Sequence, residues 1–314
     1  MGWPDLPSVS RETRTASSGE PPAVPASDIP SNPVSRETVP ALPFPRPAHC
    51  RVVAVANQKG GVGKTTSAVN VATALALHGA RVLCVDLDPQ GNASTALGVE
   101  HREGTPSVYE VLIGAKTPAE VLVPAGTSGL FCIPATIDLA GAEIELVALV
   151  ARETRLSRAL AELEAEFDYI VIDCPPSLGL LTVNALVAAR EMFIPIQCEY
   201  YALEGLTQLM RNVDMIRSHL NAGLAISAIL LTMYDGRTKL ADQVAAEVRA
   251  HFGPLVLDAV IPRTVRISEA PGFGQSVMTY DASSRGARAY EAAASEFAVR
   301  GGEPGAPPVE GTPR

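Results

Sequence analysis

Residues 51–66 read RVVAVANQKGGVGKTT, and this stretch decides the fold. The apolar run at 52–56 predicts a short buried strand, the glycines that follow predict a turn, and a helix is expected to begin near Gly63. Glycines let backbone amides converge on an anion, because side chains there would block them. The order of strand, glycine-rich turn and helix therefore predicts a phosphate-binding loop.

Three groups at the end of this loop have the right chemistry for a nucleotide. The helix N-terminus carries a partial positive charge, and Lys64 adds a full one at the β- and γ-phosphates. The hydroxyl of Thr65 lies where such loops offer an oxygen to Mg²⁺. The common pattern Gly-x-x-x-x-Gly-Lys-Ser/Thr is only half met, because Gln58 replaces its first glycine and a second lysine, Lys59, precedes the loop. The alternative is a glycine-rich turn with two solvated lysines.

The two-lysine loop resembles the deviant Walker A motif of the ParA/MinD family of ATPases. The resemblance implies that the extra lysine, Lys59, reaches across a dimer interface to the phosphates bound by the partner subunit. It also implies that ATP is held by Lys59, Gly60, Gly61, Val62, Gly63, Lys64, Thr65 and Thr66.

A second apolar run, residues 81–85, leads into Asp86-Leu-Asp88-Pro-Gln-Gly. Acids at the carboxyl end of a strand lie where open parallel sheets place their chemistry. Asp88 could instead only start a turn. The segment resembles the family's switch I, in which the matching aspartate positions the attacking water. We therefore expect Asp88 to have that role, with Asp86 as a supporting acid.

Residues 169–177, YIVIDCPPS, predict another buried strand that ends in one acid. An apolar strand that delivers an aspartate beside a phosphate loop is the Walker B arrangement, which holds Mg²⁺ directly or through water. Asp173 is accordingly the expected metal residue, together with Thr65. The alternative is a helix cap. The resemblance places the following Pro-Pro in switch II.

In the C-terminal half, site residues are predicted more from the family resemblance than from the chemistry of the side chains. Residues 197–205, QCEYYALEG, resemble a box typical of chromosomal, Soj-type ParA proteins that lies near the dimer interface. From the residues alone, Tyr200 and Tyr201 are expected to be half-buried packing. The resemblance places the adenine near Thr232, Met233, Pro262 and Arg263.

The net charge of −9 argues against a generally basic nucleic-acid binder, but the charge is uneven. Residues 51–200 carry 10 Lys and Arg against 17 Asp and Glu, whereas residues 201–300 carry 10 against 10. A DNA-binding face must therefore be local. The sequence shows no helix-turn-helix motif, so sequence-specific readout is not expected. Ordinary surface charge is the alternative for each candidate phosphate contact. These candidates are Arg237, Lys239, Arg263, Arg266, Arg285 and Arg288.

Composition divides the chain into three parts. Residues 1–47 are rich in Pro and Ser and are expected to be disordered, residues 48–300 to form the ATPase domain, and residues 301–314 to form a disordered tail. The five scattered cysteines indicate reduced thiols, with Cys84 and Cys132 as core filler. No apolar run is long enough for a membrane span, so we expect a cytoplasmic, nucleoid-associated protein without membrane contact.

The first part holds a repeat, because Val-Ser-Arg-Glu-Thr occurs at residues 9–13 and again at 34–38. A short docking peptide is one interpretation. The other is that the palindrome GTTTCACGTGAAAC, which resembles the core of the chromosomal site bound by ParB proteins, translates in frame to this peptide. Our hypothesis is that the repeat is a nucleic-acid signal that happens to be translated, and the codons at both places test it.

Strands that alternate with helices predict an α/β fold with a doubly wound, mostly parallel twisted sheet and helices on both faces, a P-loop NTPase. Further strands are expected at 130–134, 191–196, 225–232 and 256–261. Helices are expected at 67–78, 106–113, 206–220, 240–252 and 284–299, with an interrupted helical region at 139–166.

The resemblance to chromosomal ParA covers about residues 50–298. It implies a Mg²⁺- and ATP-dependent homodimer that binds double-stranded DNA without sequence preference, and a ParB-type partner that stimulates hydrolysis. Two alternatives are a MinD-like positioning ATPase, which needs a basic amphipathic C-terminal helix, and a small-molecule ligase on the same fold. An iron–sulfur carrier would need cysteines at other spacings.

Overall fold

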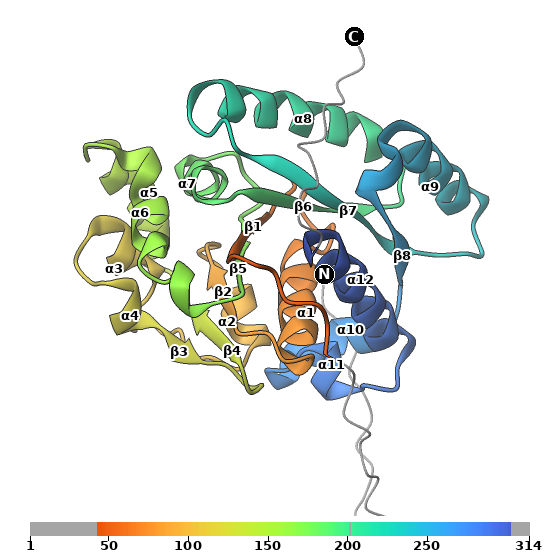
Figure 1. Ribbon diagram of the computed structural model, residues 1–314, viewed down its shortest axis with the longest axis horizontal. Coiled ribbons are helices and arrows are strands. Elements are labelled where there is room, and N and C mark those ends of the chain that lie inside the picture. Colours follow the sequence, from red (N-terminus) through yellow and green to blue (C-terminus); the bar gives the residue numbers. More distant parts are fainter. Residues whose placement is uncertain (1–42, 201, 303–314) are drawn as a thin grey trace, which may run out of the picture. The chain divides into compact units, whose positions relative to one another are not determined.

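The computed structural model describes residues 43–200 and 202–302, which form one α/β unit around an eight-stranded sheet (Figure 1). Every neighbouring pair of strands is parallel except β3 and β4. The mostly parallel sheet that the sequence predicted is confirmed. From edge to edge the strands are β3 (Val123–Pro124), β4 (Leu130–Ile133), β2 (Val82–Asp86), β5 (Tyr169–Asp173), β1 (Arg51–Val55), β6 (Glu191–Gln197), β7 (Ala225–Tyr234) and β8 (Val256–Pro262).

Helices cover both faces of the sheet because its central strands are apolar on both sides. In β1, Val52 and Ala54 belong to one hydrophobic core, and Val53 and Val55 belong to the other. The second core is closed by α1 (Lys64–Leu77), α2 (Asn92–Ala96), α11 (Val277–Tyr280) and α12 (Arg285–Gly302). The first is closed by α3 (Val108–Ile113), α4 (Pro118–Val121), α5 (Leu139–Val147), α6 (Arg155–Ala161), α7 (Leu180–Ala188), α8 (Ala202–His219) and α9 (Lys239–Phe252). In Figure 1, α8 and α1 accordingly lie on opposite sides of the sheet.

The predicted elements are present, with differences at their ends. The region 139–166 is interrupted as expected, by 3-10 turns at Arg152–Thr154 and Glu164–Glu166. Helix α8 begins at Ala202, four residues before the predicted start. Helix α7 was not predicted, because LLTVNALVA is apolar almost throughout and shows no helical period. The short helices α2, α4, α10 (Val265–Glu269) and α11 were missed as well.

Both expected boundaries of the domain differ from the structure. The ring of Phe44 stacks on His78 at the end of α1, with 3.6 Å between ring centroids, and Arg46 donates to the carbonyl of Gly79. At the other end, α12 includes Gly301 and Gly302, which we had placed in the tail. The Val-Ser-Arg-Glu-Thr repeat and most of both predicted tails lie outside the described residues.

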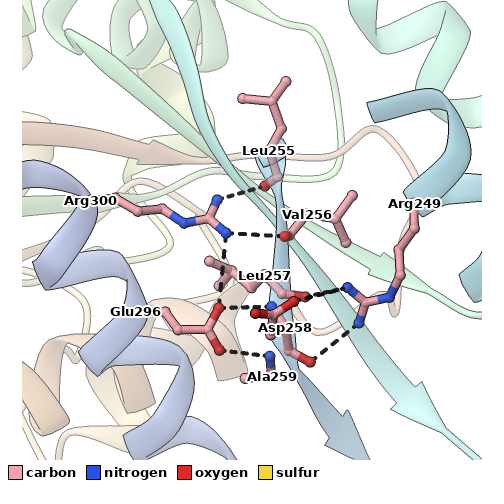
Figure 2. Close-up of polar contacts among 8 residues, drawn as sticks. All are labelled: Arg249, Leu255, Val256, Leu257, Asp258, Ala259, Glu296 and Arg300. Carbon is pink, nitrogen blue, oxygen red and sulfur yellow. Dashed lines mark hydrogen bonds and ion pairs between the residues drawn. The ribbon is translucent and has the colours of Figure 1, made fainter. Parts of the chain in front are cut away.

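Side chains cover the open edge of the sheet at β8 (Figure 2). Arg300 on α12 donates to the carbonyls of Leu255 and Val256, and Glu296 on α12 accepts from the amides of Asp258 and Ala259. From α9, Arg249 donates to the carbonyls of Leu257 and Asp258. Because its polar groups are occupied, this edge is a poor template for pairing with another strand.

The carboxyl ends of the parallel strands meet at one edge of the sheet. Asp86, the last residue of β2, is the register partner of Asp173, the last residue of β5, and Val55 of β1 is the partner of Asp173 on its other side. The three predicted segments therefore end side by side, at the position where α/β sheets bind ligands.

Candidate nucleotide site

The loop between β1 and α1 has the backbone of a phosphate-binding turn. Gly61 and Gly63 have φ of +74° and +84°, a left-handed conformation that side chains other than glycine rarely adopt. Gly63 is the N-cap of α1 and has no side chain that could accept from the first amides of the helix. These amides therefore stay available to an anion.

Two side chains fix this loop, one from the loop itself and one from β7. Asn57 donates through Nδ2 to the carbonyl of Pro195 at 2.8 Å and accepts from the amide of Lys59 at 3.0 Å. Thr232 on β7 donates through Oγ1 to the carbonyl of Val62 at 2.8 Å. The loop is therefore built before any ligand arrives, which lowers the entropic cost of binding.

Lys64 lies at the bottom of the loop with 7% of its side chain exposed. Its Nζ donates to the carbonyl of Lys59 at 3.1 Å, across the turn. Burial lowers the pKa of Lys64, and the carboxylates of Asp173 and Asp88 act in the opposite direction. A desolvated cation between two acids is suited to polyphosphate, which brings further negative charge.

Asp86 and Asp88 are linked through the backbone that follows β2. Asp86 is fully buried, and its carboxylate accepts from the amide and hydroxyl of Ser94 and from the amide of Asp88, at 2.7 to 3.2 Å. Burial raises the pKa of Asp86 to about 6, although these hydrogen bonds oppose the shift. The Asp86 carboxylate therefore anchors the segment that carries Asp88.

Asp88 starts a turn and also lines the cleft. Its Oδ1 accepts from the amide of Gln90 at 3.0 Å, so it does start a turn. It also lines the cleft in front of Lys64, and its Oδ2 makes no hydrogen bond with the described residues. One carboxylate oxygen is thus available to a ligand or a water molecule.

Asp173, the expected metal residue, is enclosed at the end of β5. It is fully buried, and neither of its carboxylate oxygens has a hydrogen-bond partner among the described residues. Burial raises the pKa of Asp173, the neighbouring Asp86 raises it further, and Thr65 and Lys64 act against this. An unpaired buried carboxylate is costly, and a divalent cation shared with the Thr65 hydroxyl would remove that cost.

An open cleft of about 520 Å³ lies at the carboxyl edge of the sheet, and Asp86 and Asp173 are buried behind it rather than in its lining. Predicted residues that line it are Gly60, Gly61, Gly63, Lys64, Thr65, Thr66, Asp88 and Met233. Val62 is buried behind the loop, and Lys59 does not line the cleft. Gln90, Asn92, Pro176, Pro271 and Gln275 also line it. Of these, Gln90 and Asn92 come from the segment that begins at Asp86, and Pro176 comes from the segment that ends the strand at Asp173.

A second cavity of about 280 Å³ adjoins the first and shares Gly63, Thr66, Met233 and Pro271 with it. It is lined by the four residues expected near the adenine, Thr232, Met233, Pro262 and Arg263. Met233 has φ of +50°, a strained conformation for a residue other than glycine. The second cavity therefore lies directly beside the phosphate loop and has both apolar and polar side chains in its lining.

Lys59 is paired within its own chain. Its Nζ lies 2.6 Å from Oε2 of Glu199, in the 197–205 box, and the two side chains are 40% and 47% exposed. The expectation for Tyr200 was wrong, because its side chain is 77% exposed rather than half-buried. Tyr201 lies outside the described residues.

All six candidate DNA contacts are exposed. Arg237 pairs with Asp235 at 2.7 Å, and Arg266 lies 3.1 Å from Glu269 and 3.5 Å from Asp281. The other four make no ion pair with the described part of the chain; they are Lys239, Arg263, Arg285 and Arg288.

Sequence reasoning gave no role to Asn57, Ser94 or Glu199, and it placed Thr232 only near the adenine. Asn57 could have been found, because it lies two residues before Lys59 where a side chain can cap the turn. Ser94 and Glu199 act through contacts made by folding, and no local pattern marks them.

In residues 43–200 and 202–302, no group of three or more His, Cys, Asp or Glu side chains could hold a metal by itself, and Cys84 and Cys132 are buried free thiols. Among these residues no helix is long and apolar enough to cross a membrane.

Comparisons with known proteins agree with this geometry. A family model described as an AAA domain matches residues 50–226. The sporulation initiation inhibitor protein Soj of Bacillus subtilis is 51% identical over 251 residues, covering 80% of this chain and 99% of Soj. The chromosome partitioning protein ParA of Caulobacter vibrioides is 52% identical over 252 residues, covering 80% and 94%.

A solved structure extends the likeness to the fold and the ligand. It is described as cobyrinic acid a,c-diamide synthase from Mycobacterium smegmatis with bound ATP analog and magnesium. It is 42% identical, has a TM-score of 0.70, and the match covers 80% of this chain and 93% of that one. On the strength of the curated relatives, this chain belongs to the Soj/ParA family of chromosome-partitioning proteins.

Proposed function

We propose that this chain is a Mg²⁺- and ATP-dependent dimerisation switch for chromosome segregation. In this proposal the ATP-bound dimer binds nucleoid DNA without sequence preference, and a ParB-type partner releases it by stimulating hydrolysis. One observation carries the proposal: Lys64 and Asp88 face a single cleft beside the unpaired Asp173, in a chain half identical to Soj and ParA.

The polyphosphate would occupy the larger cleft. The amides of residues 60–66 and the N-terminus of α1 surround it, and Lys64 offsets the charge at the β- and γ-phosphates. Asp173 and Thr65 would hold Mg²⁺, which supplies charge neutralisation on the phosphate oxygens. The adenine would lie in the adjoining cavity against Met233, Pro262 and Arg263.

Hydrolysis needs an oriented water molecule. The free oxygen of Asp88 faces the cleft, and Asp86 holds its backbone in place, so Asp88 would align the water with the γ-phosphate. Lys59 from a second copy would add positive charge at the γ-phosphate, where negative charge develops in the transition state. Hydrolysis would then require two subunits.

The DNA face would be built from three segments that touch one another. The amide of Arg263 donates to the carbonyl of Tyr234, which joins the segment after β8 to the one that carries Arg237 and Lys239. A Cβ built on Gly286 would lie 2.6 Å from a carbon of Ile267, so α12, with Arg285 and Arg288, packs closely on α10. Exposed cations on adjacent segments suit phosphate contacts rather than base readout.

The direct test is binding of double-stranded DNA of random sequence, with and without ATP, at several salt concentrations. The proposal requires binding that depends on ATP and weakens steeply with salt. Binding of equal strength in ADP and ATP would contradict it.

A second candidate is an ATP-dependent synthase, because solved structures that share 42% of residues with this chain are described as cobyrinic acid a,c-diamide synthase. A synthase must bind an acceptor molecule next to the γ-phosphate and release an amide product. Amide formation from the corresponding acid, ATP and an ammonia source, without DNA binding, would favour this candidate.

A further inference from the structure

The lysine that the proposed mechanism needs in a second copy is engaged in its own chain. Lys59 Nζ lies 2.6 Å from Oε2 of Glu199, within hydrogen-bond distance. Neither residue lines the phosphate cleft, whereas the neighbours of Lys59 in the loop, Gly60 and Gly61, do. The side chain of Lys59 is therefore directed away from its own cleft.

Glu199 is fixed at the end of β6. Its amide donates to the carbonyl of Gln197 at 2.8 Å, and its carbonyl accepts from the amide of Ala202, the first residue of α8, at 3.0 Å. Its second carboxylate oxygen, Oε1, accepts from the side-chain amide of Gln197. The carboxylate is thus held outside the lining of the cleft by contacts of its own segment.

The backbone of Lys59 is held separately from its side chain. Its amide donates to Asn57 Oδ1, and its carbonyl accepts from Lys64 Nζ. Losing the contact with Glu199 would leave these bonds and the loop intact. The direction of the Lys59 side chain is thus the one feature of this residue that Glu199 controls.

We propose that Glu199 is a positioning residue that holds Lys59 in an inactive direction in the single subunit. Closure of the dimer then requires this ion pair to break before Lys59 reaches the phosphates of the second copy. This gives the 197–205 box a role in setting the dimerisation threshold, and it rests on the proposed ATP-dependent dimer.

The size of the effect follows from exposure. The two side chains are 40% and 47% exposed, and ion pairs at such positions contribute little because water screens them. Removing the charge of Glu199 should therefore tighten dimerisation about two- to fivefold. A threshold of this size adjusts the switch without blocking it.

The test compares full-length wild type with Glu199→Gln, which keeps the shape of the side chain. Sedimentation with Mg²⁺ and a non-hydrolysable ATP analogue gives the dimer dissociation constant. We expect it to fall about two- to fivefold, while the thermal midpoint and the nucleotide affinity of the single subunit stay unchanged. A purely structural role would move the latter two quantities instead.

Two variants and one condition complete the experiment. Glu247→Gln, at an exposed position on α9 outside the 197–205 box, removes the same charge and should leave dimerisation at the wild-type value. Glu199→Asp keeps the charge and should restore the dimer constant toward wild type. At about 1 M salt, the difference between wild type and Glu199→Gln should disappear.

Dimerisation of Glu199→Gln that equals or falls below wild type would overturn the inference, because Glu199 would then contribute nothing or would support the dimer. A shift of the same size in Glu247→Gln would overturn it as well, since net charge alone would explain the result. If the wild type itself stays monomeric with the ATP analogue, the proposed function fails first.

Discussion

The phosphate cleft and the basic face are built in opposite ways. At the cleft, Lys64 is buried, Asp173 is buried without a partner, and the loop is fixed by Asn57 and Thr232. On the basic face the candidate cations are exposed, and two of the six are paired with acids of their own segments.

The difference shows where specificity resides in this molecule. Desolvated charges interact strongly and tolerate little change, whereas exposed charges are screened and partly interchangeable. The cleft should therefore respond to single substitutions in an all-or-none way, and the basic face should respond gradually and in proportion to the charge removed.

The largest effect is expected for Lys64→Ala. Removing the buried cation leaves Asp88 and Asp173 facing the phosphates without compensation, so ATP affinity should fall about 100-fold and hydrolysis should be lost. Titration with a fluorescent ATP analogue measures this. Lys116→Ala, at a partly exposed lysine far along the chain, is the control; equal losses in both variants would show that the cleft has no special electrostatics.

Asp88→Ala should separate binding from hydrolysis. The variant loses the group that aligns water but keeps Lys64 and the loop, so the hydrolysis rate should fall about 100-fold while ATP binding persists. Single-turnover kinetics give the rate, and Asp214→Ala on α8 serves as the control. Hydrolysis at the wild-type rate would remove Asp88 from its assigned role.

Acid should weaken Mg²⁺-dependent binding. Burial raises the pKa of Asp86 to about 6 and also raises the pKa of Asp173, so a proton on these carboxyls competes with the cation as the pH falls. Binding Mg²⁺ must release that proton, and affinity therefore rises with pH. Below about pH 6, Mg·ATP affinity should fall roughly tenfold per pH unit.

Calorimetry from pH 5.5 to 7.5 checks this dependence. Nucleotide binding in the presence of a chelator should be nearly flat over the same range. A pH slope that is equal with and without magnesium would place the titrating group elsewhere in the molecule.

The smallest effects are expected on the basic face. Arg285→Ala or Arg288→Ala should weaken DNA binding about three- to tenfold and reduce the salt slope by about 1, because each is free to contact a phosphate. Arg237→Ala should do less, since Asp235 already offsets its charge. ATP affinity should not change in any of the three, and a reversed order would mean that another surface contacts the DNA.

The same comparison explains what could be predicted from the sequence. The phosphate loop could be predicted because its chemistry is local: glycines, a lysine and a hydroxyl follow a strand within sixteen residues. The position of Asp173 could be predicted because parallel strands bring their carboxyl ends to one edge of the sheet, so an acid that ends an apolar run has a predictable place.

Contacts between residues far apart in the chain could not be predicted from the sequence. Glu199 lies 140 positions from Lys59, and no spacing in the chain marks the pair. Ser94 holds Asp86 only because α2 folds back over β2. Tyr200 was misjudged because an aromatic residue after a strand usually packs, and here the turn before α8 leaves it in solvent.

Light scattering on Asp88→Ala shows directly whether ATP brings two copies of the chain together. With Mg²⁺ and ATP we expect a molecular mass twice that of the single chain, and with ADP the single-chain mass. A protein that stays at the single-chain mass with Mg²⁺ and ATP, although its cleft binds the nucleotide, would contradict the ATP-dependent dimer.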